Sequence, residues 1–300
     1  MPSFRLDRLV TLCFARTLGP VLKSTGEGRL PVLMYHSVSG DLDGSVSPYY
    51  RTVTSPDVFA DQMELLRKAG YQALSLKDGL ERFRGKNGGV NKSVVITFDD
   101  GFRDFHTHAF PVLRRHGFGA TMFLPTAFIG NQSMEFKSRP CLTWGEAREL
   151  QKGGIEFGSH TVNHPKLYEL DFAQIRAELE QSKATMEHEL GAPVAAFAYP
   201  YAFPSADRQF VRNFTGILKA VGYECAVTTR IGRVGDQDDL FTLKRLPVNS
   251  ADDAALFSAK LDGAYDWLAW PQEIIKHGKK MFVAPNPART STQTAGAASN

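Results

Sequence analysis

The sequence of 300 residues contains only three cysteines, Cys13, Cys141 and Cys225, which lie far apart and form no Cys-x-x-Cys pair. This odd, scattered set argues against a disulfide-stapled fold and favours a reducing compartment. Runs of five or more like charges are absent, and the 35 Lys and Arg residues nearly balance the 32 Asp and Glu residues. We therefore expect no nucleic-acid partner.

A long hydrophobic run is also missing. Near the N-terminus the apolar stretch 9–15 is interrupted by Thr11 and flanked by charged residues, so it is too short to span a bilayer, and no Ala-x-Ala-like cleavage site follows. We therefore expect a cytoplasmic protein. Residues 1–29 are predicted to form an amphipathic segment that packs on the domain, and contact of Leu6–Leu22 with the inner membrane surface is the alternative. The apolar positions near helical spacing are Leu6, Leu9, Val10, Cys13, Phe14 and Leu18.

The C-terminal residues 285–300 have no aliphatic side chain larger than alanine and are rich in Ser, Thr and Pro, so we expect a disordered tail. The chain as a whole is 43% hydrophobic and 11% aromatic, which is enough to bury a sizeable core. No linker-like stretch interrupts it before the tail. Residues 30–284 are therefore predicted to form a single domain.

Within that domain, short apolar runs alternate with longer amphipathic stretches. The runs predict buried strands, and the stretches between them carry helix signals, such as Ser55 before Pro56 and the pair Thr143 and Glu146. Repeated β-then-α units imply an α/β fold with a mostly parallel sheet or barrel, in which functional residues lie at the carboxyl ends of the strands. The predicted strands are 32–35, 94–98, 120–124, 155–158, 194–199 and 223–228.

Two clusters at strand ends carry groups that can do chemistry. Asp99 and Asp100 follow the strand 94–98, and adjacent carboxylates there point in different directions, so one can bind a metal while the other faces water or substrate. An ordinary Asp-Asp-Gly turn is the alternative. His160 and His164 follow the strand 155–158 and are spaced by one helical turn, so both imidazoles can bind one ion. Two His and one Asp would leave an open position on that ion.

The segments Thr97-Phe98-Asp99-Asp100-Gly101 and His160-Thr161-Val162-Asn163-His164, followed by Phe197-Ala198-Tyr199-Pro200-Tyr201, resemble the motifs of the polysaccharide deacetylase family, also called the nodulation-factor deacetylase homology domain or carbohydrate esterase family 4. The resemblance covers roughly residues 30–261. It implies a distorted, incomplete (β/α) barrel and a metal-dependent hydrolase that removes N-acetyl groups from an N-acetylated saccharide.

The resemblance also implies roles for individual residues. Asp99 matches the catalytic base, and Asp100, His160 and His164 match the ligands of one divalent metal ion, for which we expect zinc, with nickel or cobalt as alternatives. Tyr201 matches the residue whose backbone N–H helps to hold the oxyanion.

Two family features are missing. Ala198 stands where many members have an arginine that orients the base, and the Leu-x-His element that supplies the general acid is absent from the C-terminal region. The segment Tyr35-His36 resembles the start of the subgroup that includes the poly-N-acetylglucosamine deacetylases, which implies His36 as the acid. Arg245 is considered as a substitute for the orienting arginine but is not included among the predicted site residues.

Three other functions are considered beside N-deacetylation. They are O-acetyl esterase activity of the same family, carbohydrate binding without catalysis, and hydrolysis of a small or lipid-linked N-acyl sugar inside the cell. Intact Asp99, Asp100, His160 and His164 argue against the inactive binding protein, and the lack of a recognisable signal peptide favours the intracellular substrate.

Overall fold

The computed structural model describes residues 5–13, 28–41, 46–85, 92–269 and 272. The main sheet has eight strands in the order β1-β12-β11-β10-β9-β6-β5-β4, and a further pairing of β1 with β5 closes seven of them into a parallel barrel. The predicted α/β barrel is confirmed. Its strands are β1 (Val32–Tyr35), β4 (Gln72–Leu74), β5 (Ser93–Phe98), β6 (Ala120–Leu124), β9 (Ile155–Ser159), β10 (Ala196–Ala198), β11 (Cys225–Ile231) and β12 (Leu243–Pro247).

The barrel is irregular at one edge of β5. Strand β4 pairs with the first half of β5, from Ser93 to Val95, whereas β6 pairs with Thr97 and Phe98 at its end. Two short pairs lie outside the barrel, the parallel β2 (Ser37–Val38) with β3 (Val53–Thr54) and the antiparallel β7 (Glu135–Phe136) with β8 (Arg139–Pro140).

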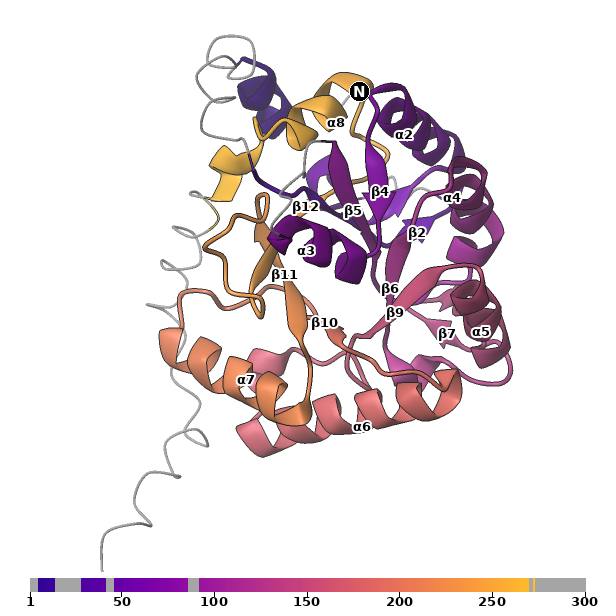
Figure 1. Cartoon of the computed structure of the whole chain (residues 1–300), viewed down its shortest axis with the longest axis vertical. Helices are drawn as coiled ribbons and strands as arrows, with labels where there is room; N and C mark the ends of the chain where they lie inside the picture. The colour runs from indigo at the N-terminus through magenta and orange to yellow at the C-terminus, as the bar shows by residue number, and fades with distance from the viewer. Residues whose placement is uncertain (1–4, 14–27, 42–45, 86–91, 270–271, 273–300) are drawn as a thin grey trace, which may run out of the picture.

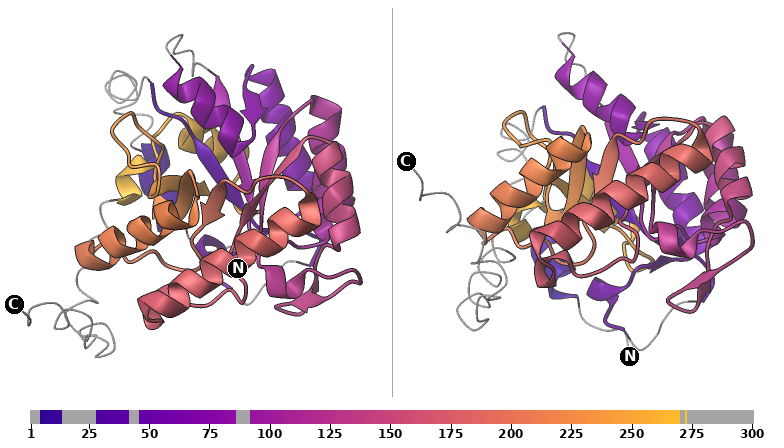
Figure 2. Two further views of the ribbon diagram at one scale, coloured as in Figure 1. Left: turned by 60° about the horizontal axis from the view of Figure 1, so that its bottom comes forward. Right: turned by 90° about the horizontal axis from the view of Figure 1, so that it is seen from below.

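Helices surround the barrel (Figure 1), and their ends follow the local sequence signals. Ser55 caps the first of them through Val58 N–H, Thr143 forms a capping box with Glu146, and the left-handed Gly191 ends the longest. In Figure 2, α6 and α7 lie side by side in both views. The helices are α2 (Pro56–Lys68), α3 (Leu76–Arg84), α4 (Phe110–His116), α5 (Trp144–Lys152), α6 (Phe172–Leu190), α7 (Arg208–Val221) and α8 (Ala254–Leu261), and a π-helical turn, Phe105–Ala109, leads into α4.

The core has two layers because strand side chains alternate between the outside and the inside of the barrel. Outward residues pack under the surrounding helices, whereas inward residues such as Val32, Val95 and Leu243 form a separate cluster. Helix α3 contributes Leu76 and Leu80 to that inner cluster and lies across the middle of the barrel in Figure 1. Its N-terminus contacts Thr121 and Glu156 near the starts of β6 and β9, so it covers the end of the barrel at which the strands begin.

The described part of the N-terminal segment, residues 5–13, packs on the domain through its polar face and not through the apolar positions. Residues 6–13 are helical, and the buried side chains are Asp7 and Thr11, whereas Leu6 and Leu9 are 62% and 47% exposed. The polar face is the buried one because the domain offers it hydrogen-bonding partners: Tyr265 donates to Asp7, and Trp267 donates to Thr11.

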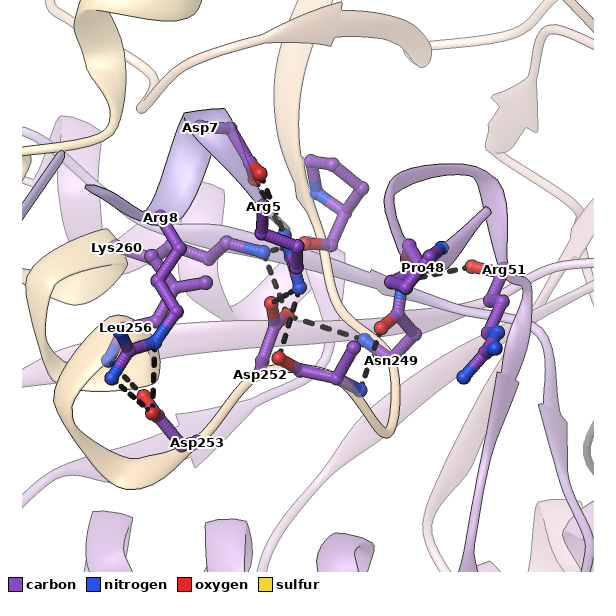
Figure 3. Close-up of polar contacts among 12 residues, drawn as sticks. Arg5, Asp7, Arg8, Pro48, Arg51, Asn249, Asp252, Asp253, Leu256 and Lys260 are labelled. Atoms are coloured by element: carbon purple, nitrogen blue, oxygen red, sulfur yellow. Dashed lines mark hydrogen bonds and ion pairs between the residues drawn. The ribbon is translucent and has the colours of Figure 1, made fainter. Parts of the chain in front are cut away.

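A buried ion network fastens this segment to the loop between β12 and α8 (Figure 3). Arg5 pairs with Asp7 and, at 3.0 Å, with Asp252, whose side chain is fully buried. Lys260 donates to the other oxygen of Asp252 at 2.7 Å. Arg8 pairs at the surface with Asp253, the N-cap of α8.

The predicted tail at 285–300 and most of Leu6–Leu22 lie outside the described residues. In the part of the chain that the structure describes, every helix is too short or too polar to cross a bilayer.

Candidate metal centre and active site

The two carboxylates stand where β5 leaves the barrel. Val95 and Thr97 point into the interior, and Asp99 continues this alternation, so its side chain lies inside the mouth of the barrel. The Asp99 N–H donates to the Tyr35 carbonyl at 3.0 Å, which continues the β1–β5 ladder by one residue. Asp100 then adopts φ +74°, and this left-handed turn separates the directions of the two carboxylates.

His160 and His164 come together through a loop, not through a helical turn as their spacing predicted. After β9 the chain has positive φ at Thr161 (+71°) and His164 (+53°), and the segment is not helical. Glu178 of α6 holds the loop in place, because its carboxylate accepts hydrogen bonds from the backbone N–H groups of Val162 and Asn163 at 2.8 and 3.0 Å.

Asp100, His160 and His164 form a buried cluster whose candidate ligand atoms all lie within 4.8 Å of one another. Oδ1 of Asp100 is 3.2 Å from Nε2 of His164 and 3.7 Å from Nε2 of His160. That Oδ1 and the Nδ1 of His164 are buried and have no hydrogen-bond partner. Buried polar atoms are normally satisfied, so the orphaned carboxylate oxygen and the His₂Asp donor set fit one divalent ion with open coordination positions.

The protonation states suit ligation. Burial lowers the pKa of His160 to about 3, so its imidazole is neutral, and its Nδ1 lies 2.8 Å from the Ala198 carbonyl, to which it can donate. That bond leaves Nε2 as the lone-pair atom facing the cluster. Burial opposes ionisation of Asp100, but its close contact with His164 and the nearby charge of Lys137 outweigh it and hold its pKa well below the usual range.

Asp99 is held by an arginine from the far side of the barrel. Arg245 on β12 is fully buried, and its guanidinium contacts both carboxylate oxygens, at 2.7 and 2.8 Å. It also donates to the Thr228 carbonyl and to Thr97 Oγ1. Burial would raise the pKa of Asp99, but the charge and hydrogen bonds of Arg245 lower it overall, so the carboxylate is ionised.

Arg245 is thus a site residue that the sequence prediction left out. The missed signal is the segment Leu243–Pro247, which was not recognised as a strand. Within a strand, Leu243 and Arg245 share the inward face, which would have placed a cation inside the barrel.

The remaining two predicted site residues lie beside Asp99 and His164, respectively. His36 follows β1, and its Nε2 lies 3.9 Å from Asp99 Oδ2 with 18% of the side chain exposed. Burial lowers the pKa of His36, although the charges of Asp100 and Asp99 oppose that shift. Tyr201 follows β10 with φ +56°, and its ring lies 4.6 Å from the ring of His164.

Unusual backbone conformation is concentrated around this site. Among the described residues, seven non-glycine positions have positive φ, and all except Lys92 lie in the segments that form the site. Such conformations cost roughly 1–3 kcal/mol each and persist where the surroundings enforce them, which is common at functional sites. The site positions are Asp100, Lys137, Ser138, Thr161, His164 and Tyr201.

Comparison with known proteins agrees with this geometry. Residues 86–225 match the sequence model of the family described as polysaccharide deacetylase. YxkH of Bacillus subtilis (strain 168), whose name assigns it provisionally to the polysaccharide deacetylases, is 27% identical over 241 residues, which cover 80% of this chain and 79% of that protein. The poly-beta-1,6-N-acetyl-D-glucosamine N-deacetylase of Staphylococcus aureus (strain MSSA476) is 27% identical over 202 residues, which cover 62% of this chain and 69% of that protein.

A solved structure extends the likeness to the fold. The Streptococcus pyogenes deacetylase PplD, in complex with acetate, superposes with a TM-score of 0.65 at 26% identity and covers 78% of this chain and 98% of that one. These matches, together with the buried Asp-His-His cluster beneath the barrel mouth, show that the chain is similar to polysaccharide deacetylases in sequence and in fold.

Proposed function

We propose that this protein is a metal-dependent hydrolase that removes N-acetyl groups from an N-acetylated amino sugar, carried by a polysaccharide, an oligosaccharide or a glycolipid. The observation that carries the proposal is the division of labour between the two carboxylates. Asp100 faces two imidazoles with an unsatisfied oxygen, whereas Asp99 is ionised and held by Arg245. Amide hydrolysis needs both an ion site and a separate base.

Asp100, His160 and His164 would hold the ion, and we propose zinc because two imidazoles and one carboxylate with an open position are typical of hydrolytic zinc sites. When bound, the ion would act as a Lewis acid on the substrate carbonyl and activate a water molecule at neutral pH.

Asp99 would accept the proton that the attacking water gives up. Its carboxylate is buried and ionised, and the two hydrogen bonds from Arg245 fix its orientation. Arg245 is a positioning residue here, since its guanidinium is fully buried behind the base and contacts Asp99 instead of the substrate side.

His36 would give a proton from Nε2 to the departing nitrogen, because a protonated nitrogen leaves as a neutral amine far more readily than an unprotonated one leaves as a nitrogen anion. Its place beside Asp99, at the end of the neighbouring strand β1, supports this role. The backbone N–H of Tyr201 would donate to the carbonyl oxygen as negative charge develops there.

The choice of an N-acetylated saccharide rests on the activity for which the Staphylococcus aureus relative is named and on the Tyr35-His36 segment. It is tested by incubating the zinc-loaded protein with N-acetylglucosamine oligomers, lipid-linked N-acetyl sugars and acetylated xylan, and measuring released acetate and free amine together. We expect acetate and amine in equal amounts from an N-acetylated substrate, and loss of both in Asp99→Asn.

His188→Gln is the matched control, because His188 is exposed on α6 away from the site. Acetate from xylan alone, without amine, would assign O-acetyl esterase activity instead. Binding of saccharides without any acetate release would contradict hydrolysis altogether.

A further inference from the structure

The β7–β8 hairpin brings a lysine into the site that neither the sequence motifs nor the proposed mechanism uses. Its two-residue turn is Lys137-Ser138, with φ +51° and +58°, the left-handed values of a type I′ turn. Asn and Gly are the residues that this turn prefers, so Lys and Ser are held in it by the surrounding contacts.

The hairpin is fastened on both strands. Phe136 of β7 packs 4.3 Å from the ring of Phe128 and 5.0 Å from the ring of His164. Arg139 of β8 donates to Ser37 Oγ at 3.1 Å and to the Asp41 carbonyl at 3.2 Å. The turn is therefore anchored over the cluster of Asp100, His160 and His164.

From this turn the Lys137 ammonium reaches the buried carboxylate of Asp100, with Nζ 2.9 Å from Oδ2. The same Nζ lies 4.6 Å from the ring centroid of Phe136 and 5.8 Å from that of Tyr201, so two aromatic rings flank the cation. The side chain is 43% exposed, whereas Asp100 is 2% exposed. Lys137 thus approaches Asp100 from the solvent side of the site.

The two oxygens of Asp100 consequently have different surroundings. Oδ2 is held by Lys137, whereas Oδ1 faces Nε2 of His164 and Nε2 of His160 and has no hydrogen-bond partner. We propose that Lys137 is a positioning residue that restricts Asp100 to one-oxygen metal ligation and adds positive charge beside the ion. This inference rests on the proposed function in requiring that the cluster binds a divalent ion.

Both effects of Lys137 should weaken the binding of the metal ion. Its charge repels a divalent cation, and its hydrogen bond withholds the second carboxylate oxygen. The gain for an enzyme would be a coordination position that stays open to water and substrate. Lys137→Met should therefore bind zinc at least about fivefold more tightly. Two unit charges a few ångströms apart interact by about 1 kcal/mol even in water, and this energy corresponds to a change of about fivefold in affinity.

The experiment uses the full-length protein, stripped with a chelator and titrated with zinc against a competing indicator, and cobalt(II) as a spectroscopic probe. A second carboxylate oxygen on cobalt(II) raises its coordination number and weakens its visible absorption. We expect tighter zinc binding and weaker cobalt absorption in Lys137→Met, and near-wild-type values in Lys137→Arg, which keeps a cationic donor.

Lys166→Met is the matched control, because Lys166 is also cationic and is only two residues from His164 in the sequence, but pairs with Glu169 at 3.4 Å. It should leave zinc affinity and the cobalt spectrum unchanged. Zinc affinity that is unchanged or weaker in Lys137→Met would overturn the role of Lys137 while leaving the proposed function intact. Failure of the wild-type protein to bind zinc or cobalt stoichiometrically would refute the proposed function itself, and this inference with it.

Discussion

Replacing Arg245 with methionine would leave a buried, ionised Asp99 without its partner. Arg245 is fully buried and makes both close contacts to that carboxylate, and methionine fills a similar volume without any donor. Removing one member of a buried ion pair costs roughly 3–5 kcal/mol, because the remaining charge stays in a poorly solvated place. We therefore expect the free energy of unfolding of Arg245→Met to fall by about 3–5 kcal/mol at pH 7.

The cost should depend on pH with a defined sign. In the wild type the pKa of Asp99 lies below its usual value, so this group stabilises the fold above pH 4 and the contribution is lost as the pH falls through that lowered pKa. Without Arg245, burial raises the pKa of Asp99, and the native state of the variant takes up a proton as the pH falls. The difference in stability between the two proteins should therefore shrink on acidification, by up to about 1.4 kcal/mol per pH unit.

Urea unfolding of both proteins in chelator at pH 7 and pH 5 measures this difference. Asp99→Asn/Arg245→Met removes both charges and should be more stable than Arg245→Met alone. Lys244→Met is the control on the same strand, since Lys244 pairs with Asp238 nearer the surface and should cost at most about 1 kcal/mol. A loss below about 1 kcal/mol for Arg245→Met, equal at both pH values, would refute the reasoning.

Four further results are expected. Asp99→Asn should retain stoichiometric zinc but lose hydrolysis, whereas Asp100→Asn should lose affinity for zinc as well, because of the two carboxylates only Asp100 faces the two imidazoles. Elemental analysis measures the bound zinc, and acetate release measures hydrolysis. His36→Ala should keep its zinc and lose amide hydrolysis by about 10²–10⁴-fold, and should lose less with an activated ester, whose leaving group departs without a proton. The metal-free protein should lose stability in urea as the pH falls from about 6.5 toward 3, because the lowered pKa of His160 keeps the folded imidazole neutral while the unfolded one takes up a proton. Arg5→Met should lower the free energy of unfolding by about 3–5 kcal/mol, because the buried carboxylate of Asp7 loses the cation that pairs with it and Asp252 loses one of its two.

Each of these results has a control and a contrary outcome. Equal zinc loss in both carboxylate variants would remove the distinction between base and ligand, and unchanged amide turnover in His36→Ala would exclude His36 as the acid. In the pH series, an unchanged slope in His160→Gln would contradict the assignment of the stability loss to His160. For the N-terminal network, Arg8→Met should lower the free energy of unfolding by at most about 1 kcal/mol, because the Arg8–Asp253 pair is at the surface. An equally small loss in Arg5→Met would refute the expected contribution of the buried ion pairs.

The sequence alone determined the architecture and the position of the main site along the chain. Buried parallel strands are apolar on both faces, and helix starts carry local caps, so strands such as β5 and β6 and helices such as α2 and α5 are visible in short windows. The placement of Asp99 and Asp100 follows from one strand end, and the family resemblance depends on short motifs of the same kind.

The tertiary structure decided which groups meet. Arg245 is 146 residues from Asp99 in sequence, and their contact depends on the closure of the barrel through β1, which pairs with both β5 and β12. Lys137 reaches Asp100 only because the strained β7–β8 turn is anchored over the site.

The N-terminal segment makes the same point for a surface helix. The spacing of its apolar residues predicted an apolar contact face, yet Asp7 is buried and Leu6 is exposed. The reason is that the domain offers partners to the polar residues: Asp252 accepts from Arg5, and Tyr265 donates to Asp7. A charged side chain is buried only where partners compensate its desolvation, and partners that are distant in sequence are known only once the chain has folded.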